Sequence, residues 1–170
     1  IWGASRQTLS KASFIERANR AVKMAIQMGT TAIRTHVDTV TFSDLLALEA
    51  ILEVREQWRK YIDIQIVALG HPGESADHTA AVREALRLGA DLIGGAPALL
   101  ADPQRSIRAA FMLAEESGKA IDLHIDETED PQANSLEFLA EQTIAHGMQG
   151  QVTAGHCCSL AFMDAPVVER

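Results

Sequence analysis

The sequence lacks several features that would indicate particular classes of protein. It has only two cysteines, Cys157 and Cys158, and they are adjacent. Apart from a strained vicinal pair they can form no disulfide, which predicts a reducing, cytoplasmic setting. No apolar run is long enough to cross a bilayer, and no cluster of lysine and arginine marks a nucleic-acid surface. We therefore expect neither a membrane nor a nucleic acid as a partner.

The beginning of the chain lacks the marks of a targeting segment. Residues 1–5 contain no basic stretch leading into an apolar one, so no signal peptide is predicted. The first residue is Ile1 rather than methionine. We expect the natural N-terminus to lie upstream and the chain to be an excerpt.

The composition is that of a globular domain. The chain has 170 residues, enough for one domain with a core of its own. It is 47% hydrophobic and 22% charged, which argues against disorder. The formal net charge of -8 favours solubility and carries little information about the fold.

Helix-like and strand-like hydrophobic periods alternate along the whole chain. Ser13 and Glu16 have capping-box spacing at the start of the first helix. Asp102 and Pro103 mark the start of the fourth, and Gly118 lies just past its end. The predicted helices cover about 13–28, 43–60, 75–88, 103–117 and 134–146. The predicted strands cover about 31–38, 62–69, 91–94, 120–126 and 151–156.

Successive predicted strands begin roughly 30 residues apart, the size of a strand–helix repeat. Helices of this length between strands indicate parallel pairing and right-handed crossovers. Two α/β architectures fit: a doubly wound open sheet, or a (β/α)8 barrel of which five of eight strands are present. Neither Gly-x-Gly-x-x-Gly nor a P-loop occurs, so a nucleotide crevice has no support.

Three predicted strands carry polar residues where a parallel sheet is normally apolar. For any one strand, hydrogen-bonded core polar groups or a solvated face would explain this. Three such strands favour a shared pocket, because unpaired buried charge is costly and sites of both architectures lie at the C-terminal strand ends. Strand alternation groups Asp122, His124 and Asp126, then Arg34, His36 and Asp38, then Val152, Ala154 and His156.

His124 and Glu127 carry the chemistry that such a pocket needs. Histidine is the commonest metal ligand, and a glutamate beside activated water is a common proton shuttle. With His124 near the end of its strand and Glu127 just beyond, the imidazole can hold a metal while the carboxylate reaches the substrate.

The chain resembles the cytosine deaminase branch of the amidohydrolase superfamily, whose fold is a (β/α)8 TIM barrel. The resemblance is carried by residues 34–38, 89–94 with Pro97, 121–127 and 147–156, and the segments 121–127 and 152–156 are its specific parts. It implies that residues 1–170 are a partial barrel domain covering about strands 2 to 6.

The resemblance also implies roles for individual residues. His124 would bind one divalent metal ion, zinc or iron, and Glu127 would be the catalytic acid/base. His156 would be a second catalytic residue, hydrogen-bonded to the attacking oxygen or the tetrahedral intermediate. The remaining metal ligands of the family, a His-x-His pair on the first strand and an aspartate on the eighth, would lie outside this chain. We therefore expect the 170 residues alone to be inactive.

The substrate is where the chain departs from the family. Members that act on cytosine have a glutamine after the third strand, and here His71 takes that place. We assign His71, His36 and Asp38 to substrate binding; for His36 and Asp38 a role in supporting the metal ligands is an equal alternative.

The predicted function is hydrolytic deamination of a small amino-substituted nitrogen heterocycle. Two alternatives stay open: an amidohydrolase cleaving a cyclic amide or an N-alkylamine C–N bond, and a non-catalytic α/β module that binds a small ligand. Whether the protein forms a homo-oligomer stays an open question.

Overall fold

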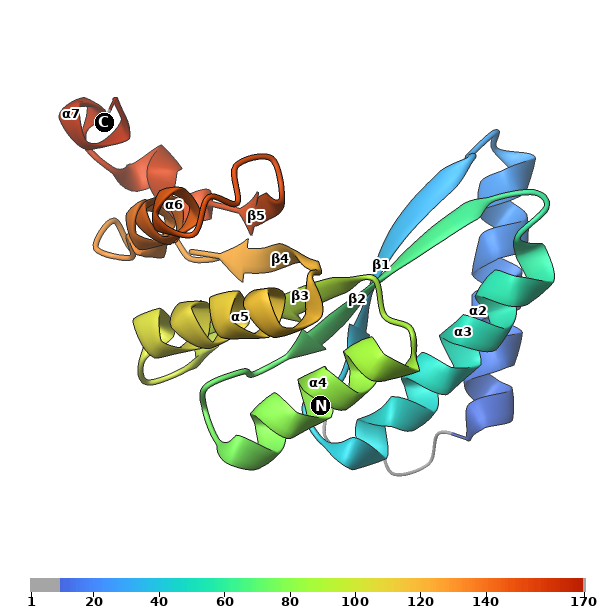
Figure 1. The fold of residues 1–170 in the computed structure, drawn as a ribbon. Helices are drawn as coiled ribbons and strands as arrows, with labels where there is room; N and C mark the ends of the chain where they lie inside the picture. Colours follow the sequence, from blue (N-terminus) through green and yellow to red (C-terminus); the bar gives the residue numbers. More distant parts are fainter. Residues whose placement is uncertain (1–9, 170) are drawn as a thin grey trace.

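Five parallel strands form the frame of the molecule, and helices alternate with them along the chain (Figure 1). The computed structural model describes residues 10–169, apart from the side chain of Phe42. The strands are β1 (Ala32–Asp38), β2 (Asp63–Gly70), β3 (Leu92–Gly95), β4 (Ala120–Ile125) and β5 (Val152–His156). The helices are α2 (Lys11–Gln27), α3 (Leu45–Trp58), α4 (Ala76–Leu88), α5 (Pro103–Ser117), α6 (Ser135–Ala145) and α7 (Ala165–Val168), with 3-10 turns at Phe42–Asp44, Pro97–Leu99 and Cys158–Phe162.

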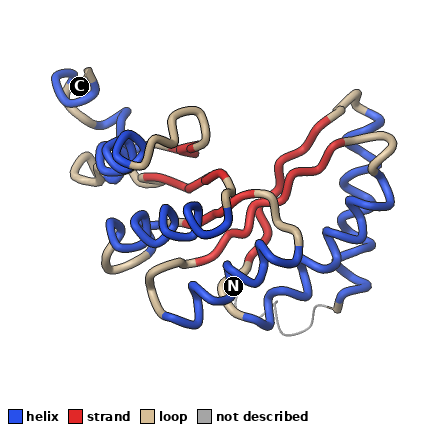
Figure 2. The backbone as a smooth tube through the Cα atoms, viewed as in Figure 1, coloured by secondary structure: helices blue, strands red, loops and turns tan. Residues whose placement is uncertain are grey.

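The strand order decides between the two predicted architectures. The strands lie in the sheet in chain order, β1-β2-β3-β4-β5, and every neighbouring pair is parallel. A doubly wound sheet reverses its strand order at a switch point, whereas a barrel adds each strand beside the previous one. The chain is therefore an α/β half-barrel (Figure 2).

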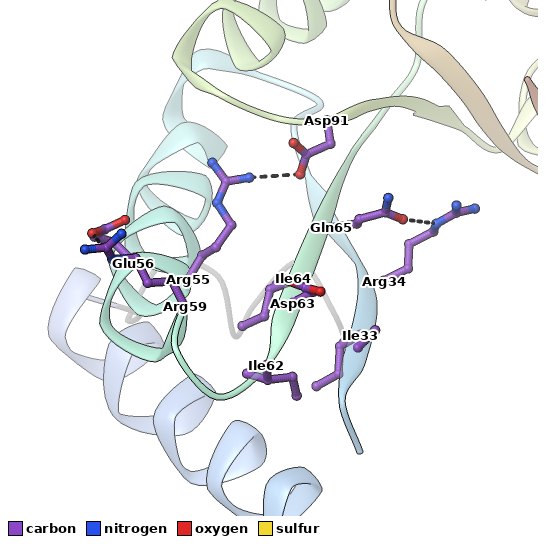
Figure 3. Close-up of a pocket in the computed structure, with 11 residues that line it drawn as sticks. Ile33, Arg34, Arg55, Glu56, Arg59, Ile62, Asp63, Ile64, Gln65 and Asp91 are labelled. Atoms are coloured by element: carbon purple, nitrogen blue, oxygen red, sulfur yellow. Dashed lines mark hydrogen bonds and ion pairs between the residues drawn. The ribbon is translucent and has the colours of Figure 1, made fainter. Parts of the chain in front are cut away.

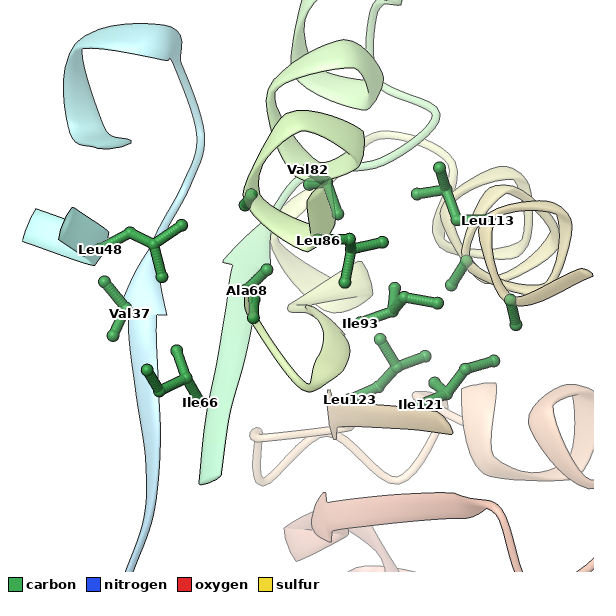
Figure 4. Close-up of a cluster of buried hydrophobic side chains, with 14 of the residues drawn as sticks. Val37, Leu48, Ile66, Ala68, Val82, Leu86, Ile93, Leu113, Ile121 and Leu123 are labelled. Carbon is green, nitrogen blue, oxygen red and sulfur yellow. The ribbon is translucent and has the colours of Figure 1, made fainter. Parts of the chain in front are cut away.

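One hydrophobic core joins the strands to the helices that cover them. Side chains of alternate positions in the strands, such as Ile66, Ile93 and Leu123, pack against helix residues such as Val82 and Leu113 (Figure 4). Right-handed crossovers place successive helices on the same face of such a sheet. The opposite, inner face is left for polar side chains.

Several helix ends agree with the sequence signals. Ser75 caps α4, because its Oγ accepts the His78 N–H at 3.1 Å. Asp102 caps α5 in the same way, and Gly118 ends that helix with a left-handed backbone at φ 67°. Within residues 10–169, no helix is long and apolar enough to cross a membrane.

The predicted start of the first helix is wrong by two residues. Helix α2 begins at Lys11, and Ser10 is its cap, with its Oγ accepting the Ser13 N–H at 3.2 Å. Ser13 is therefore a donor to the cap and not the cap itself. The capping-box pattern favoured Ser13, because Glu16 stands three residues after it, whereas the residue three after Ser10 is Ser13 itself. Helix α2 nevertheless begins one turn earlier than this pattern indicates.

Candidate active site

His124 lies at the C-terminal end of β4, the edge of the sheet where the predicted pocket should form. It is half-buried, and its ring lies on the inner face of the half-barrel, where it contacts the rings of His36 on β1 and His156 on β5. Burial, and then the neighbouring imidazoles of His36 and His156, lower its pKa, although the carboxylates of Glu127 and Asp122 oppose the shift. His124 is therefore neutral at neutral pH, the form in which an imidazole can bind a metal.

Glu127 follows β4 by two residues, and Asp126 lies between the strand and Glu127 with a left-handed backbone at φ 46°. Alternation predicted that Asp126 would share the inner face with His124, and this prediction is wrong. The Asp126 side chain accepts the backbone N–H groups of Ser135 at 3.1 Å and Leu136 at 3.0 Å, at the start of α6. Asp126 thus fixes the loop that carries Glu127, whose own side chain is exposed.

His156 is the last residue of β5 and reaches the site for a reason that alternation did not predict. Val152 and Ala154, which should share its face, pack against the outer core. His156 has a left-handed backbone at φ 67°, which breaks the alternation. Its ring centre lies 4.7 Å from that of His124, in an edge-to-face arrangement.

His124, Glu127 and His156 form a cluster that fits a divalent metal ion. Each offers one ligand atom, and the three atoms lie within 4.8 Å of one another. Glu127 Oε2 lies 3.5 Å from His156 Nε2. Imidazole nitrogen with carboxylate oxygen is a donor set suited to zinc and to iron.

His36, on β1, extends the row of imidazoles. Its ring centre is 4.6 Å from that of His124, and its Nε2 is 3.3 Å from Asp122 Oδ1. Asp38 is half-buried two residues further along β1, at its C-terminal end. The prediction that β1, β4 and β5 contribute side chains to one place is therefore consistent with the structure for His36, His124 and His156.

Among the described residues, His71 shares no ring contact or hydrogen bond with His36, His124 or His156. It follows β2, which lies beside β1 and is separated from β4 by β3. Its ring faces that of His78 on α4, with 6.1 Å between the ring centres. Its Nδ1 is buried and has no hydrogen-bond partner among the described residues. A role for His71 in binding substrate stays a prediction.

Arg34 and Asp122 belong to the site, although no role could be assigned to them from the sequence. Arg34 Nη1 donates to Asp122 Oδ2 at 2.7 Å, and the Asp122 side chain is only 6% exposed. Burial raises the pKa of Asp122, but the hydrogen bonds from His36 and Arg34 outweigh it, so the pKa lies below its ordinary value. Asp122 is therefore ionised. Alternation had put both residues on polar strand faces, and that was the available signal.

A large cavity lies at the other end of the strands. It has a volume of about 800 Å³ and is lined by the first residues of β1 and β2, by Arg55 of α3 and by Arg59 just past the end of that helix (Figure 3). Four of its charged groups form two pairs: Arg55 with Asp91 at 2.9 Å and Arg59 with Glu56 at 2.7 Å. In barrels the N-terminal strand ends serve stability, and chemistry takes place at the C-terminal ends. The cavity is therefore not the candidate active site.

Known proteins resemble the chain over most of its length. A pterin deaminase from Rhizobium rhizogenes is 37% identical over 164 residues, which is 93% of this chain and 37% of that protein. An N-isopropylammelide isopropyl amidohydrolase from Pseudomonas sp. is 37% identical over 84% of this chain and 36% of its own length. The crystal structure of 5-methylcytosine deaminase from Klebsiella pneumoniae with 5-fluorocytosine matches with a TM-score of 0.91 and 32% identity, over 99% of this chain and 42% of that one. No protein-family model matches.

The fold and the cluster together define an α/β barrel protein with a metal-type His/Glu site at the C-terminal strand ends. More narrowly, the chain belongs to the amidohydrolase superfamily, in its cytosine deaminase-like branch. The resemblance stated from the sequence is confirmed. The chain spans little more than a third of the length of the curated relatives just described.

Proposed function

We propose that the protein is a metal-dependent hydrolase that removes an amino group from a small nitrogen heterocycle. The observation that carries this proposal is the cluster of His124, Glu127 and His156 at the C-terminal ends of β4 and β5. The names of similar proteins support the proposal, since they are deaminases and amidohydrolases of pterin, cytosine and ammelide compounds. The five strands would be the second to the sixth of a complete barrel.

His124 is the proposed metal ligand of this chain, since its neutral imidazole is held on the inner face. When bound, a divalent ion such as zinc or iron activates water as a nucleophile at neutral pH. The other ligands of the ion would come from outside the described residues.

Glu127 and His156 are the proposed catalytic residues. Glu127 is exposed beside the cluster, so its carboxylate can accept a proton from the attacking water and deliver it to a ring nitrogen. It can then take the second proton from the added hydroxyl and give it to the amine as the C–N bond breaks. His156 Nε2 is placed to donate a hydrogen bond to the oxygen that becomes attached to the substrate carbon. Their 3.5 Å separation keeps both groups around one reacting centre.

A second candidate reaction breaks the bond to an N-alkyl substituent instead of the bond to an amino group. Two relatives favour it: the Pseudomonas amidohydrolase and an N-isopropylammelide isopropylaminohydrolase from Burkholderia multivorans, which matches with a TM-score of 0.79 and 36% identity. The chemistry at the metal is shared, and only the leaving amine differs. We rank it second because both the pterin and the 5-methylcytosine relatives are named as deaminases.

The product of the reaction tests the proposal. The full-length protein, loaded separately with zinc and with iron, is incubated with aminopyrimidines, aminotriazines, purines, pterins and N-alkylaminotriazines. Ammonia is measured enzymatically and alkylamines by derivatisation and mass spectrometry. Ammonia from an amino-substituted ring supports deamination, and alkylamine alone supports the second reaction. Release of neither amine across the panel contradicts both.

A further inference from the structure

An ionic network lies directly beneath the row of histidines. Arg34 Nη1, on β1, donates to Asp122 Oδ2 on β4 at 2.7 Å and to Thr153 Oγ1 on β5 at 3.3 Å. Its Nε donates to Gln65 Oε1 on β2 at 3.1 Å, a contact drawn in Figure 3. One guanidinium therefore joins side chains from four strands across the inner face.

The network spans a distance that strand pairing does not cover. β1 and β4 are separated by β2 and β3, so along a flat sheet they would be about 14 Å apart at the usual spacing of about 4.8 Å. Their side chains meet because the sheet curves into a half-barrel. The Arg34–Asp122 contact therefore depends on the curvature of the sheet and stabilises it.

Asp122 connects this network to His36. Its Oδ2 receives Arg34, and its Oδ1 lies 3.3 Å from His36 Nε2. Because Asp122 is ion-paired with the Arg34 guanidinium and its oxygens act as acceptors, the His36 Nε2–H donates to it. The tautomer and the plane of the His36 ring are fixed by this bond, as carboxylates fix the metal-binding histidines of many enzymes.

His36 in turn meets His124 edge to face. The rings are 4.6 Å apart at an interplanar angle of 67°. A rotation of the His36 ring would remove this contact and leave His156 as the remaining ring neighbour of His124. Arg34, Asp122 and His36 thus form a continuous chain of contacts that ends on the proposed metal ligand.

We propose that Arg34, Asp122 and His36 are a positioning unit that sets the orientation of the His124 imidazole for metal binding. This inference rests on the proposed function, since it takes His124 as a metal ligand. It gives His36 a role different from substrate binding, and it assigns a task to Asp122 and Arg34. Neither of these two needs to touch the substrate.

A second arginine–aspartate pair provides a matched control. Arg55 Nη1 donates to Asp91 Oδ2 at 2.9 Å (Figure 3). The same oxygen accepts the Ile66 N–H at 2.8 Å. This pair links α3, β2 and β3 near the N-terminal strand ends. It resembles the Arg34–Asp122 pair in chemistry, but among the described residues neither Arg55 nor Asp91 makes a hydrogen bond or ion pair with His36 or His124. Asp91→Asn therefore reports what the loss of a structural pair does.

The experiment compares Asp122→Asn, His36→Gln and Asp91→Asn in the full-length protein. Cobalt(II) affinity is measured by its visible absorption in competition with a chelator, and kcat and KM are measured on whichever substrate the panel identifies. Asp122→Asn should weaken cobalt binding about 10- to 100-fold and lower kcat more than it changes KM. His36→Gln, at a half-exposed position, should have a similar effect. Asp91→Asn should leave cobalt affinity unchanged.

The double variant tests whether Asp122 acts through His36. In a His36→Gln background, Asp122→Asn should cause no further loss of cobalt affinity. The proposal is overturned if the two losses multiply, or if Asp122→Asn lowers only the unfolding temperature, as Asp91→Asn does. Should Asp122→Asn fail to fold, an unchanged cobalt affinity of His36→Gln alone would overturn it. Cobalt binding needs no substrate, so a failed substrate search would count against the proposed function and leave this test intact.

Discussion

Replacement of Asp126 should show how the loop that carries Glu127 is held. The Asp126 side chain is 1% exposed and accepts two backbone N–H groups at the start of α6. Asn134 occupies the N-cap position of that helix, but its side chain makes no capping hydrogen bond and instead donates to Glu137 at 2.7 Å. Asp126 therefore supplies the cap from the end of the neighbouring strand.

The expected cost follows from these contacts. A hydrogen bond to a charged group contributes about 1.5–3 kcal/mol, so loss of both in Asp126→Ala should lower the free energy of unfolding by about 3–6 kcal/mol. The left-handed backbone at φ 46° adds roughly 1 kcal/mol for alanine and nothing for glycine. Asp126→Gly should thus be less harmful than Asp126→Ala. Asp126→Asn retains one acceptor and tolerates this backbone, so about 1–2 kcal/mol is expected.

Urea unfolding of the full-length variants gives the order of stability, and hydrogen exchange of the Ser135 and Leu136 amides reports the cap directly. Asp130→Ala is a control in the same loop, because Asp130 is exposed and accepts only a local N–H, from Gln132 at 2.9 Å. Its cost should be within about 0.5 kcal/mol. Equal stability of Asp126→Ala and Asp126→Asn, with unchanged exchange at both amides, would refute the reasoning.

Two further predictions concern packing and thiol reactivity. Gly94→Ala should destabilise by about 1–3 kcal/mol, because its Cβ would lie 2.7 Å from Val67 Cγ1 and 2.9 Å from a backbone oxygen of β2. Gly95→Ala, whose nearest atom is a leucine methyl at 3.2 Å, should cost less, and the reverse order in thermal unfolding would contradict this account. Burial and nearby acidic groups raise the pKa of the Cys157 thiol, whereas Cys158 is exposed. Iodoacetamide at pH 8 should therefore alkylate Cys158 before Cys157, as followed by mass spectrometry. Equal alkylation rates of the two cysteines would contradict this prediction.

The sequence was sufficient to predict most of the fold. Hydrophobic period located all five strands of the sheet and the five helices α2 to α6, and the spacing of the strands indicated parallel pairing. The choice between a barrel and a doubly wound sheet could not be made from periodicity, because both use the same strand–helix unit. It depends on the order of strands in space, which is set by contacts between distant segments.

The site was predictable in its members but not in its geometry. Strand alternation works while the backbone stays extended, and it placed His36, Asp122 and His124 on the inner face. It failed for Asp126 and for Val152 and Ala154. The reason is the left-handed backbone of Asp126 and His156, which no local pattern indicated. The contact between Arg34 and Asp122 was likewise hidden, since it crosses two intervening strands.

The most direct test of the account separates the roles of His124 and Glu127. We predict that Glu127→Gln in the full-length protein retains a stoichiometric metal ion by elemental analysis, yet releases ammonia about 10²- to 10⁴-fold more slowly. Under the same conditions His124→Ala should lose the ion, and Glu129→Gln, at an exposed position of the same loop, should behave as the unmodified protein. Loss of the metal from Glu127→Gln, or full activity without that carboxylate, would contradict the assignment of Glu127 as the group that moves the proton.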